Sequence, residues 1–139
     1  MASFGGWRRQ ASYPSSVVHG VSSTTTASAS SRIIAIHSAA RWRAHFDASK
    51  LSTQLMVIDF TATWCKPCRL MEPAIEEMAA KFTDVVFVKI DVDELMEVAR
   101  AFEVQAMPSF LLIKQGKVID KVVGTKKDEL QRKIEKHKI

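Results

Sequence analysis

The two cysteines of this 139-residue chain lie three positions apart, in the segment Trp64-Cys65-Lys66-Pro67-Cys68. They stand where an apolar run typical of a strand gives way to the pattern of an amphipathic helix. A thiol at the first turn of a helix faces free backbone N–H groups and the positive end of the helix dipole, so its pKa falls from about 8.5. Cys65 is that thiol, and Cys68 lies one turn further along the same face, within reach of a disulfide. The pair can therefore cycle between dithiol and disulfide.

A structural disulfide or a zinc site would account for the cysteine pair less well than a pair that cycles between dithiol and disulfide. A disulfide that closes so small a loop constrains the unfolded chain little, so it would stabilise the fold weakly. A zinc site usually needs a second Cys-x-x-Cys or a histidine pair at ligand spacing. The histidines are instead scattered, at His19, His37, His45 and His137. We therefore expect redox chemistry at the cysteines, with no metal and no cofactor beyond the pair itself.

Length and charge predict one folded domain with an extension. A chain of 139 residues has room for a single domain with its own core. The net charge of +5 is uneven, because residues 1–32 contain three arginines and no acid, whereas the remainder carries 17 basic and 15 acidic side chains. Charges interspersed in this way form no basic stripe, so we expect no nucleic-acid binding. No apolar stretch has membrane-spanning length, and a single reactive pair suits a reducing compartment.

Residues 1–32 are rich in serine, threonine and other small residues, and we predict that they form a disordered extension. Such a segment buries too little apolar surface to offset the entropy lost on ordering. Its arginines and its lack of acids also resemble an organellar transit peptide, while a solvated extension without a targeting role explains the composition equally well. Ala2 takes the place of the glycine that amino-terminal myristoylation requires.

Apolar periodicity predicts the elements that hold the cysteines. Residues 33–36 form a short strand candidate, and Ser38 is a suitable N-cap for the helix that follows. Residues 55–60 are apolar except for Asp59, which is typical of a strand buried on both faces. A helical stripe of apolar residues follows the cysteines, and Pro73 inside it predicts a kink.

The second half of the chain completes a mixed sheet. Residues 85–90 indicate another buried strand, parallel to the first because a helix separates the two. Asp93 is a candidate N-cap for a short helix. Residues 109–113 and 118–123 flank a turn and predict a hairpin, and a helix from 126 to about 137 closes the chain. The predicted fold class is α/β, with a central mixed β-sheet and helices on both faces.

The order of these features, with Trp-Cys-x-Pro-Cys after the first buried strand and Met107-Pro108 before the hairpin, resembles a thioredoxin from residue 33 to residue 139. Several separated features agree, which makes the resemblance specific. Within that family the chain is most similar to plant h-type thioredoxins with an amino-terminal extension. The segments that carry this narrower resemblance are Ser38-Ala39-Ala40-Arg41-Trp42, Met71-Glu72-Pro73-Ala74-Ile75, Lys89-Ile90-Asp91-Val92-Asp93-Glu94 and Ala106-Met107-Pro108.

The resemblance implies a thioredoxin fold over residues 33–139 and a role for the residues near the cysteines. Cys65 would attack a target disulfide as the thiolate, and Cys68 would resolve the mixed disulfide. Asp59 occupies the family's buried-acid position and would help Cys68 lose its proton, because burial raises a carboxyl pKa toward neutrality. Lys89 would lie near Asp59 and tune it. Without the resemblance, a hydrogen-bonded core acid and a solvated lysine at a strand end would explain these two residues.

The same resemblance implies substrate contacts beside the cysteines. Met107-Pro108 matches the family's cis-proline site, where main-chain groups of the preceding residue pair with an extended substrate. Trp64 would cover the site as an exposed aromatic contact. A trans proline that opens an edge strand and a tryptophan packed in the core are the alternatives. Gly116 and Gly124 match family glycines and should serve backbone conformation, with Gly124 also leaving room for a partner.

Two positions depart from the commonest family pattern. Lys66 stands where glycine is usual, and a cation beside Cys65 should favour the thiolate and make the couple somewhat more oxidising. Thr61 stands where many thioredoxins carry an aromatic residue, so the apolar rim of the site should be thinner there. Pro67 keeps the pattern, because a proline in the first helical turn lacks only an N–H that would be unpaired anyway.

These features predict a thiol-disulfide oxidoreductase that reduces disulfides in other proteins. The resemblance implies electrons from an NADPH-dependent thioredoxin reductase or from glutathione, and we expect a monomer. A non-catalytic binding module that uses the surface around Trp64 and Met107 is the rival class, and the retention of both cysteines argues against it. The h-type resemblance favours a cytoplasmic location, whereas the composition of residues 1–32 favours a mitochondrion or plastid.

Overall fold

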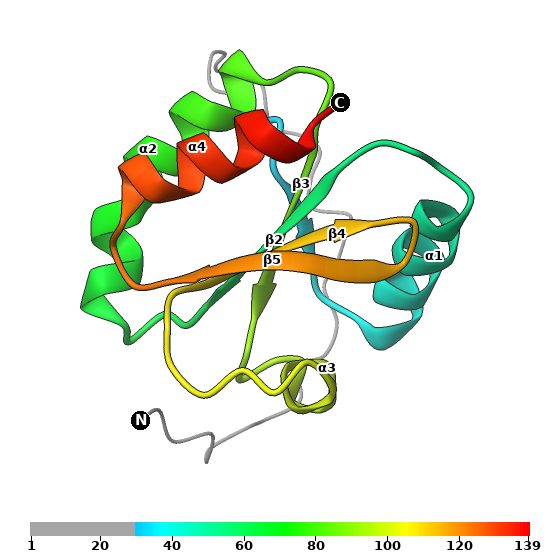
Figure 1. Cartoon of the computed structure of the whole chain (residues 1–139). Helices are drawn as coiled ribbons and strands as arrows, with labels where there is room; N and C mark the ends of the chain where they lie inside the picture. Colours follow the sequence, from blue (N-terminus) through cyan, green and yellow to red (C-terminus); the bar gives the residue numbers. More distant parts are fainter. Residues whose placement is uncertain (1–29) are drawn as a thin grey trace.

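The computed structural model describes residues 30–139, so most of the predicted disordered extension lies outside the described residues. Figure 1 shows a central sheet with helices packed around it. The elements in chain order are β1 (Ile34–Ile36), α1 (Ala39–Lys50), β2 (Met56–Thr61), α2 (Lys66–Lys81), β3 (Val86–Asp91), α3 (Met96–Ala101), β4 (Ser109–Lys114), β5 (Lys117–Val123) and α4 (Lys127–His137).

The strands form a mixed sheet in the order β1-β3-β2-β4-β5. β1, β3 and β2 run parallel, whereas β4 pairs antiparallel with β2, and β5 pairs antiparallel with β4. Helix α2 forms the crossover between β2 and β3 that a parallel pair requires. Helices α2 and α4 cover one face, and α1 and α3 lie on the other (Figure 1). The predicted α/β fold with a mixed sheet between helices is confirmed.

Strand β2 divides the core between the two faces of the sheet. Ile58 and Phe60 are buried in the cluster that includes α1 and α3, whereas Val57 is buried in the cluster that includes α2 and α4. Because side chains alternate along a strand, Asp59 shares the α2 face with Val57. The helix that begins at the cysteines therefore packs over the charged residue of β2.

One of the two predicted helix caps is correct and the other is wrong. Ser38 caps α1, and its Oγ accepts a hydrogen bond from the backbone N–H of Arg41 at 3.1 Å. Asp93 does not cap α3, because that helix begins after Leu95. The carboxylate of Asp91 instead accepts the backbone N–H of Asp93 at 2.7 Å and holds a turn before the helix. The side chain of Asp93 is therefore available to a different partner.

Helix α2 is held at the end opposite the cysteines by the chain that precedes β1. Arg32 donates hydrogen bonds to the carbonyl oxygens of Ala79 and Thr83, at 2.7 and 3.2 Å. Carbonyl groups at a helix end have no partner within the helix, so the guanidinium supplies one. The helix continues through Pro73.

Within residues 30–139, no helix has both the length and the apolar character needed to cross a membrane.

Candidate active site

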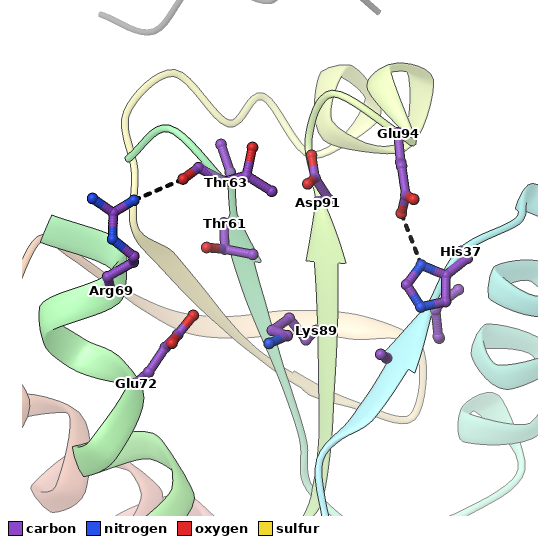
Figure 2. A pocket seen from close by; sticks show the side chains of 11 residues that line it. His37, Thr61, Thr63, Arg69, Glu72, Lys89, Asp91 and Glu94 are labelled. Carbon is purple, nitrogen blue, oxygen red and sulfur yellow. Dashed lines mark hydrogen bonds and ion pairs between the residues drawn. The ribbon is translucent and has the colours of Figure 1, made fainter. Parts of the chain in front are cut away.

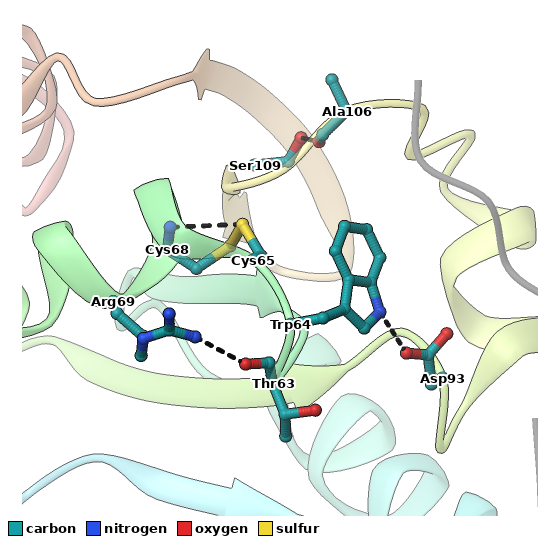
Figure 3. Close-up of a disulfide and its surroundings, with 8 residues drawn as sticks. All are labelled: Thr63, Trp64, Cys65, Cys68, Arg69, Asp93, Ala106 and Ser109. Carbon is teal, nitrogen blue, oxygen red and sulfur yellow. Dashed lines mark hydrogen bonds between the residues drawn. A yellow bond between two sulfur atoms is a disulfide. The ribbon is translucent and has the colours of Figure 1, made fainter.

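The two cysteines form a disulfide at the amino-terminal end of α2 (Figure 3). Their Cα atoms are 5.3 Å apart. Cys65 is the N-cap of the helix, and its Sγ accepts a hydrogen bond from the backbone N–H of Cys68 at 3.2 Å. Pro67 lies in the first turn, as predicted. Because the N–H groups at a helix start favour a negatively charged acceptor, the reduced Cys65 is placed to form a stabilised thiolate.

Both cysteine side chains are shielded in the disulfide form. Cys65 is 4% exposed and Cys68 is 3% exposed. Two apolar residues near them in the sequence are exposed, Trp64 at 52% and Leu70 at 69%. An exposed aromatic side chain beside a shielded disulfide, as Trp64 is in Figure 3, suits contact with a protein surface.

Trp64 is held at the surface by a partner from a distant loop. Its Nε1 donates a hydrogen bond to the carboxylate of Asp93 at 2.7 Å (Figure 3). Its exposure excludes the alternative of ordinary core packing. On the other side of the cysteines, Arg69 donates a hydrogen bond to the carbonyl oxygen of Thr63 at 2.7 Å. These two bonds connect the segment before Cys65 to the loop after β3 and to α2.

The loop before β4 contains the predicted cis proline. The peptide bond between Met107 and Pro108 is cis. Met107 packs against the core cluster that contains both cysteines, and the carbonyl oxygen of Pro108 accepts the backbone N–H of Gly124 at 2.9 Å. Gly124 has a φ of +99°, and a Cβ at that position would meet no atom within 4 Å. Its backbone conformation requires glycine, and the space beside it is open, which agrees with both parts of the prediction.

Asp59 is buried beneath α2 and is only 6% exposed. In the sheet it is the register partner of Lys89 on β3 and of Phe110 on β4. Burial raises the pKa of Asp59 from 3.8 to about 7, while the charge of Lys89 lowers this pKa and the charge of Glu72 raises it. The carboxyl group can therefore gain or lose a proton near neutral pH.

A pocket of about 390 Å³ opens where β1, β2 and β3 end, between the sheet and α2 (Figure 2). Thr61 lines this pocket, and an aromatic ring at the same position would occupy part of the space. The ionisable residues of the lining come from four segments of the chain. They are His37, Arg69, Glu72, Lys89, Asp91 and Glu94.

The sequence did not reveal two features of this site. Glu72 belongs to a segment that carried the family resemblance, but its place in the pocket with Lys89 was not foreseen. The signal that could have found it is the spacing of four residues from Cys68, which places both on one face of the helix. The contact of Asp93 with Trp64 has no comparable signal, because the two residues are 29 positions apart.

Within the part of the chain that the structure describes, no three His, Cys, Asp or Glu side chains are grouped to hold a metal ion. His37 pairs with Glu94 at 3.0 Å, and His137 pairs with Asp120 at 3.0 Å.

Known proteins are similar to this chain in both sequence and fold. Residues 34–136 match the family model named Thioredoxin. The chain is 55% identical over 111 residues to Thioredoxin H2 of Arabidopsis thaliana, which covers 80% of this chain and 84% of that protein. It is 58% identical over 105 residues to Thioredoxin H2-2 of Oryza sativa subsp. japonica, which covers 75% and 78%. The crystal structure of Thioredoxin NaTrxh from Nicotiana alata has a TM-score of 0.79 and 60% identity, covering 83% of this chain and all of that one.

Proposed function

The chain belongs to the thioredoxin family and is a thiol-disulfide oxidoreductase similar to plant h-type members, and we propose that Cys65 is its nucleophile and Cys68 its resolving thiol. The observation that carries this assignment is the position of Cys65 as the N-cap of α2, disulfide-bonded to Cys68. The amino end of the helix stabilises a thiolate at Cys65 more than at Cys68, which lies inside the helix.

The reaction begins with the reduced pair. The Cys65 thiolate attacks one sulfur of a target disulfide, and the other target sulfur leaves as a thiolate that takes up a proton. Cys68 then loses its proton to the Asp59 carboxylate and attacks the Cys65 sulfur of the mixed disulfide. The second target sulfur leaves as a thiolate and is protonated from solvent, and Asp59 returns to solvent the proton that it took from Cys68. The target gains two electrons and two protons, and the chain ends as the Cys65–Cys68 disulfide.

Asp59 is suited to take the proton of Cys68 because of its surroundings. A carboxyl group with a pKa of about 7 is a far stronger base than an exposed aspartate, yet it is still partly ionised at neutral pH. Lys89, its register partner on β3, favours the ionised form. We assign Lys89 the role of tuning Asp59, and Lys66 the role of tuning Cys65 from the exposed first turn of α2.

The substrate surface is formed by Trp64 and by the Met107-Pro108 loop. An extended target segment would pair with the main chain of Met107, which gives affinity without strong sequence demands. Trp64, exposed and hydrogen-bonded to Asp93, supplies a rigid apolar contact beside the disulfide. Gly124 leaves space for the bound segment.

The electron donor we propose is an NADPH-dependent thioredoxin reductase, with the glutathione system as the alternative. We further propose that the protein acts as a monomer on disulfide-containing proteins in the cytoplasm. The similarity to plant h-type thioredoxins supports that compartment. The composition of residues 1–32 supports a mitochondrion or plastid instead.

The test compares two single-cysteine variants with the parent protein. NADPH consumption is followed with a thioredoxin reductase and a protein disulfide substrate. Cys65→Ser should abolish turnover and form no adduct with the target. Cys68→Ser should also abolish turnover but accumulate a mixed disulfide, visible by mass spectrometry without reductant, because the attack remains and the resolution is lost.

The outcomes separate the candidate functions. Turnover by Cys65→Ser at the parental rate would overturn the proposed nucleophile. Binding of targets without turnover by the parent would favour the non-catalytic binding module. Turnover of the parent with glutathione and a glutaredoxin, but not with the reductase, would change the donor alone.

A further inference from the structure

The pocket between α2 and the sheet holds two opposite charges that face each other. Figure 2 shows the side chain of Glu72, from α2, and that of Lys89, from β3, pointing toward one another across this space. Glu72 is exposed at the opening, whereas Lys89 is half-buried. The two charged side chains therefore lie between solvent and the buried region beneath the cysteines.

Two features of chain geometry place Asp59 and Cys68 next to this pair. Lys89 is the register partner of Asp59 in the parallel pairing of β2 and β3, so their side chains are neighbours on one face of the sheet. Glu72 follows Cys68 by four residues, so the two lie one above the other on one face of α2. Lys89 therefore lies between two carboxyl groups, that of Asp59 on the sheet and that of Glu72 on the helix, and the charges of Lys89 and Glu72 both act on Asp59.

The charged surroundings of Asp59 are few within residues 30–139. β3 contributes Lys89 and α2 contributes Glu72 and the cysteine pair, whereas β4 contributes the apolar Phe110. Helix α4 packs over the same face through the buried Leu130 and Ile134, which carry no charge. Apart from the thiols, the charges that act on Asp59 from these elements are therefore Lys89 and Glu72.

We propose that Glu72 is a positioning residue of the disulfide-exchange reaction: its carboxylate opposes the pull of Lys89 on Asp59 and so keeps Asp59 a strong enough base to accept the proton of Cys68. It acts in two ways, since it repels a second negative charge at Asp59 and attracts the ammonium group of Lys89. Both effects disfavour the ionised form of Asp59. The proposal rests on the role proposed above for Asp59.

The direction of the electrostatic effects supports this assignment. The pKa of Asp59 is raised first by burial, is lowered by Lys89 and is raised again by Glu72. Because Glu72 is exposed, solvent screens its charge, and its contribution is smaller than that of burial. The expected effect is a change in pH dependence and not a loss of the reaction.

The test is a titration of the Asp59 carboxyl carbon by NMR in the oxidised protein. Glu72→Gln should lower the titration midpoint by about half a pH unit, because an exposed charge interaction amounts to less than about 1 kcal/mol. Glu72→Lys should lower it further, and Lys89→Met should raise it. Glu77→Gln is the matched control, since Glu77 is exposed on the same helix and does not line the pocket.

A kinetic measurement follows the same groups during the reaction. The rate at which the mixed disulfide is resolved, measured against pH, should have its midpoint displaced in Glu72→Gln by the amount seen in the titration. Identical Asp59 midpoints in the parent, Glu72→Gln and Glu77→Gln would overturn the proposal. The titration needs no target or reductase, so its failure is distinguishable from a failure of the proposed function.

Discussion

Two aspartates on one face of the sheet have opposite environments. Asp59, on the central strand β2, is buried, and burial raises its pKa to about 7. Asp120, on the edge strand β5, contacts Lys133 at 2.9 Å and His137 at 3.0 Å, both on α4. Its partial burial acts to raise the pKa, but hydrogen bonds from Lys133, His137 and the backbone outweigh that effect and lower the pKa to about 2.

The difference shows that partners and solvent, not residue type, decide what a carboxyl group does here. Asp120 stays ionised at every physiological pH and joins the last helix to the edge of the sheet. Lys133 also contacts Glu129 at 3.1 Å, so the pairing extends along α4. Asp59 has apolar neighbours, and Lys89 and Glu72 act on it only through their charges, so it holds a proton near neutral pH. One group stabilises the fold, whereas the other is kept at a cost to stability and is available for chemistry.

Replacing Asp59 should have the largest effect and should stabilise the protein at high pH. Its pKa in the folded state, about 7, exceeds the value of 3.8 expected when unfolded, so the folded protein binds this proton more tightly. The cost is absent below the unfolded pKa, grows between the two values and is complete above the folded one. Asp59→Asn should therefore raise the free energy of unfolding by up to about 4 kcal/mol near pH 8.

Urea denaturation of the oxidised parent and Asp59→Asn, near pH 4 and near pH 8, measures this difference. The two proteins should be similar at the lower pH and diverge at the higher one, while the variant resolves mixed disulfides slowly. Equal stability at the higher pH would show that Asp59 is not held at a raised pKa.

Replacing Asp120 should have a smaller effect of the opposite sign. Its folded pKa of about 2 lies below 3.8, so its contribution is present above the unfolded pKa and is lost as the pH falls through about 2. Since the side chain is 23% exposed, screening reduces the contribution. Asp120→Asn should lower the free energy of unfolding by about 1 kcal/mol at neutral pH.

Salt distinguishes the two aspartates further. Sodium chloride at about 1 M should weaken the Asp120 contribution, because exposed charges are screened, and should leave the Asp59 effect nearly unchanged. A loss of stability in Asp120→Asn that salt does not reduce would contradict the electrostatic origin assigned to it.

Lys66 provides an exposed charge on the first turn of α2, and its replacement should have the smallest effect. An exposed ion interaction amounts to less than about 1 kcal/mol, which corresponds to less than about 20 mV for a two-electron couple. Lys66→Gly should make the Cys65–Cys68 couple more reducing by that amount, measured by equilibration against glutathione. Lys81→Gln, at the far end of the same helix, is the control. A potential equal to or more oxidising than the parent would refute the tuning role of Lys66.

Local features of the site were predictable where they depend on neighbouring residues. Ser38 caps α1 as expected, because a cap needs only the next helical turn. Asp93 does not cap α3. The carboxylate of Asp91 holds the turn before that helix, and the side chain of Asp93 accepts a hydrogen bond from Trp64 instead. The sequence contains no information that Asp93 would meet the tryptophan, because the two residues are 29 positions apart.

Burial was predictable from pattern, but electrostatic partners were not. The apolar strand around Asp59 indicated a desolvated acid, and the structure agrees. Lys89 was placed near it only through the family resemblance, and Glu72 was not connected with it at all. The register of β2 with β3 and the packing of α2 over that register bring the three charges together.

The sequence by itself determined the redox pair, because two cysteines three positions apart at the start of a helix need only consecutive residues to form their disulfide. It also determined the mixed sheet, since apolar periodicity and a helical crossover specify strands and their direction. Tertiary structure alone decided which charges act on Asp59, which carboxylate holds Trp64 and which aspartate stays ionised. These properties arise between residues far apart in the chain, where strand register and helix packing set the distances on which electrostatic energies depend.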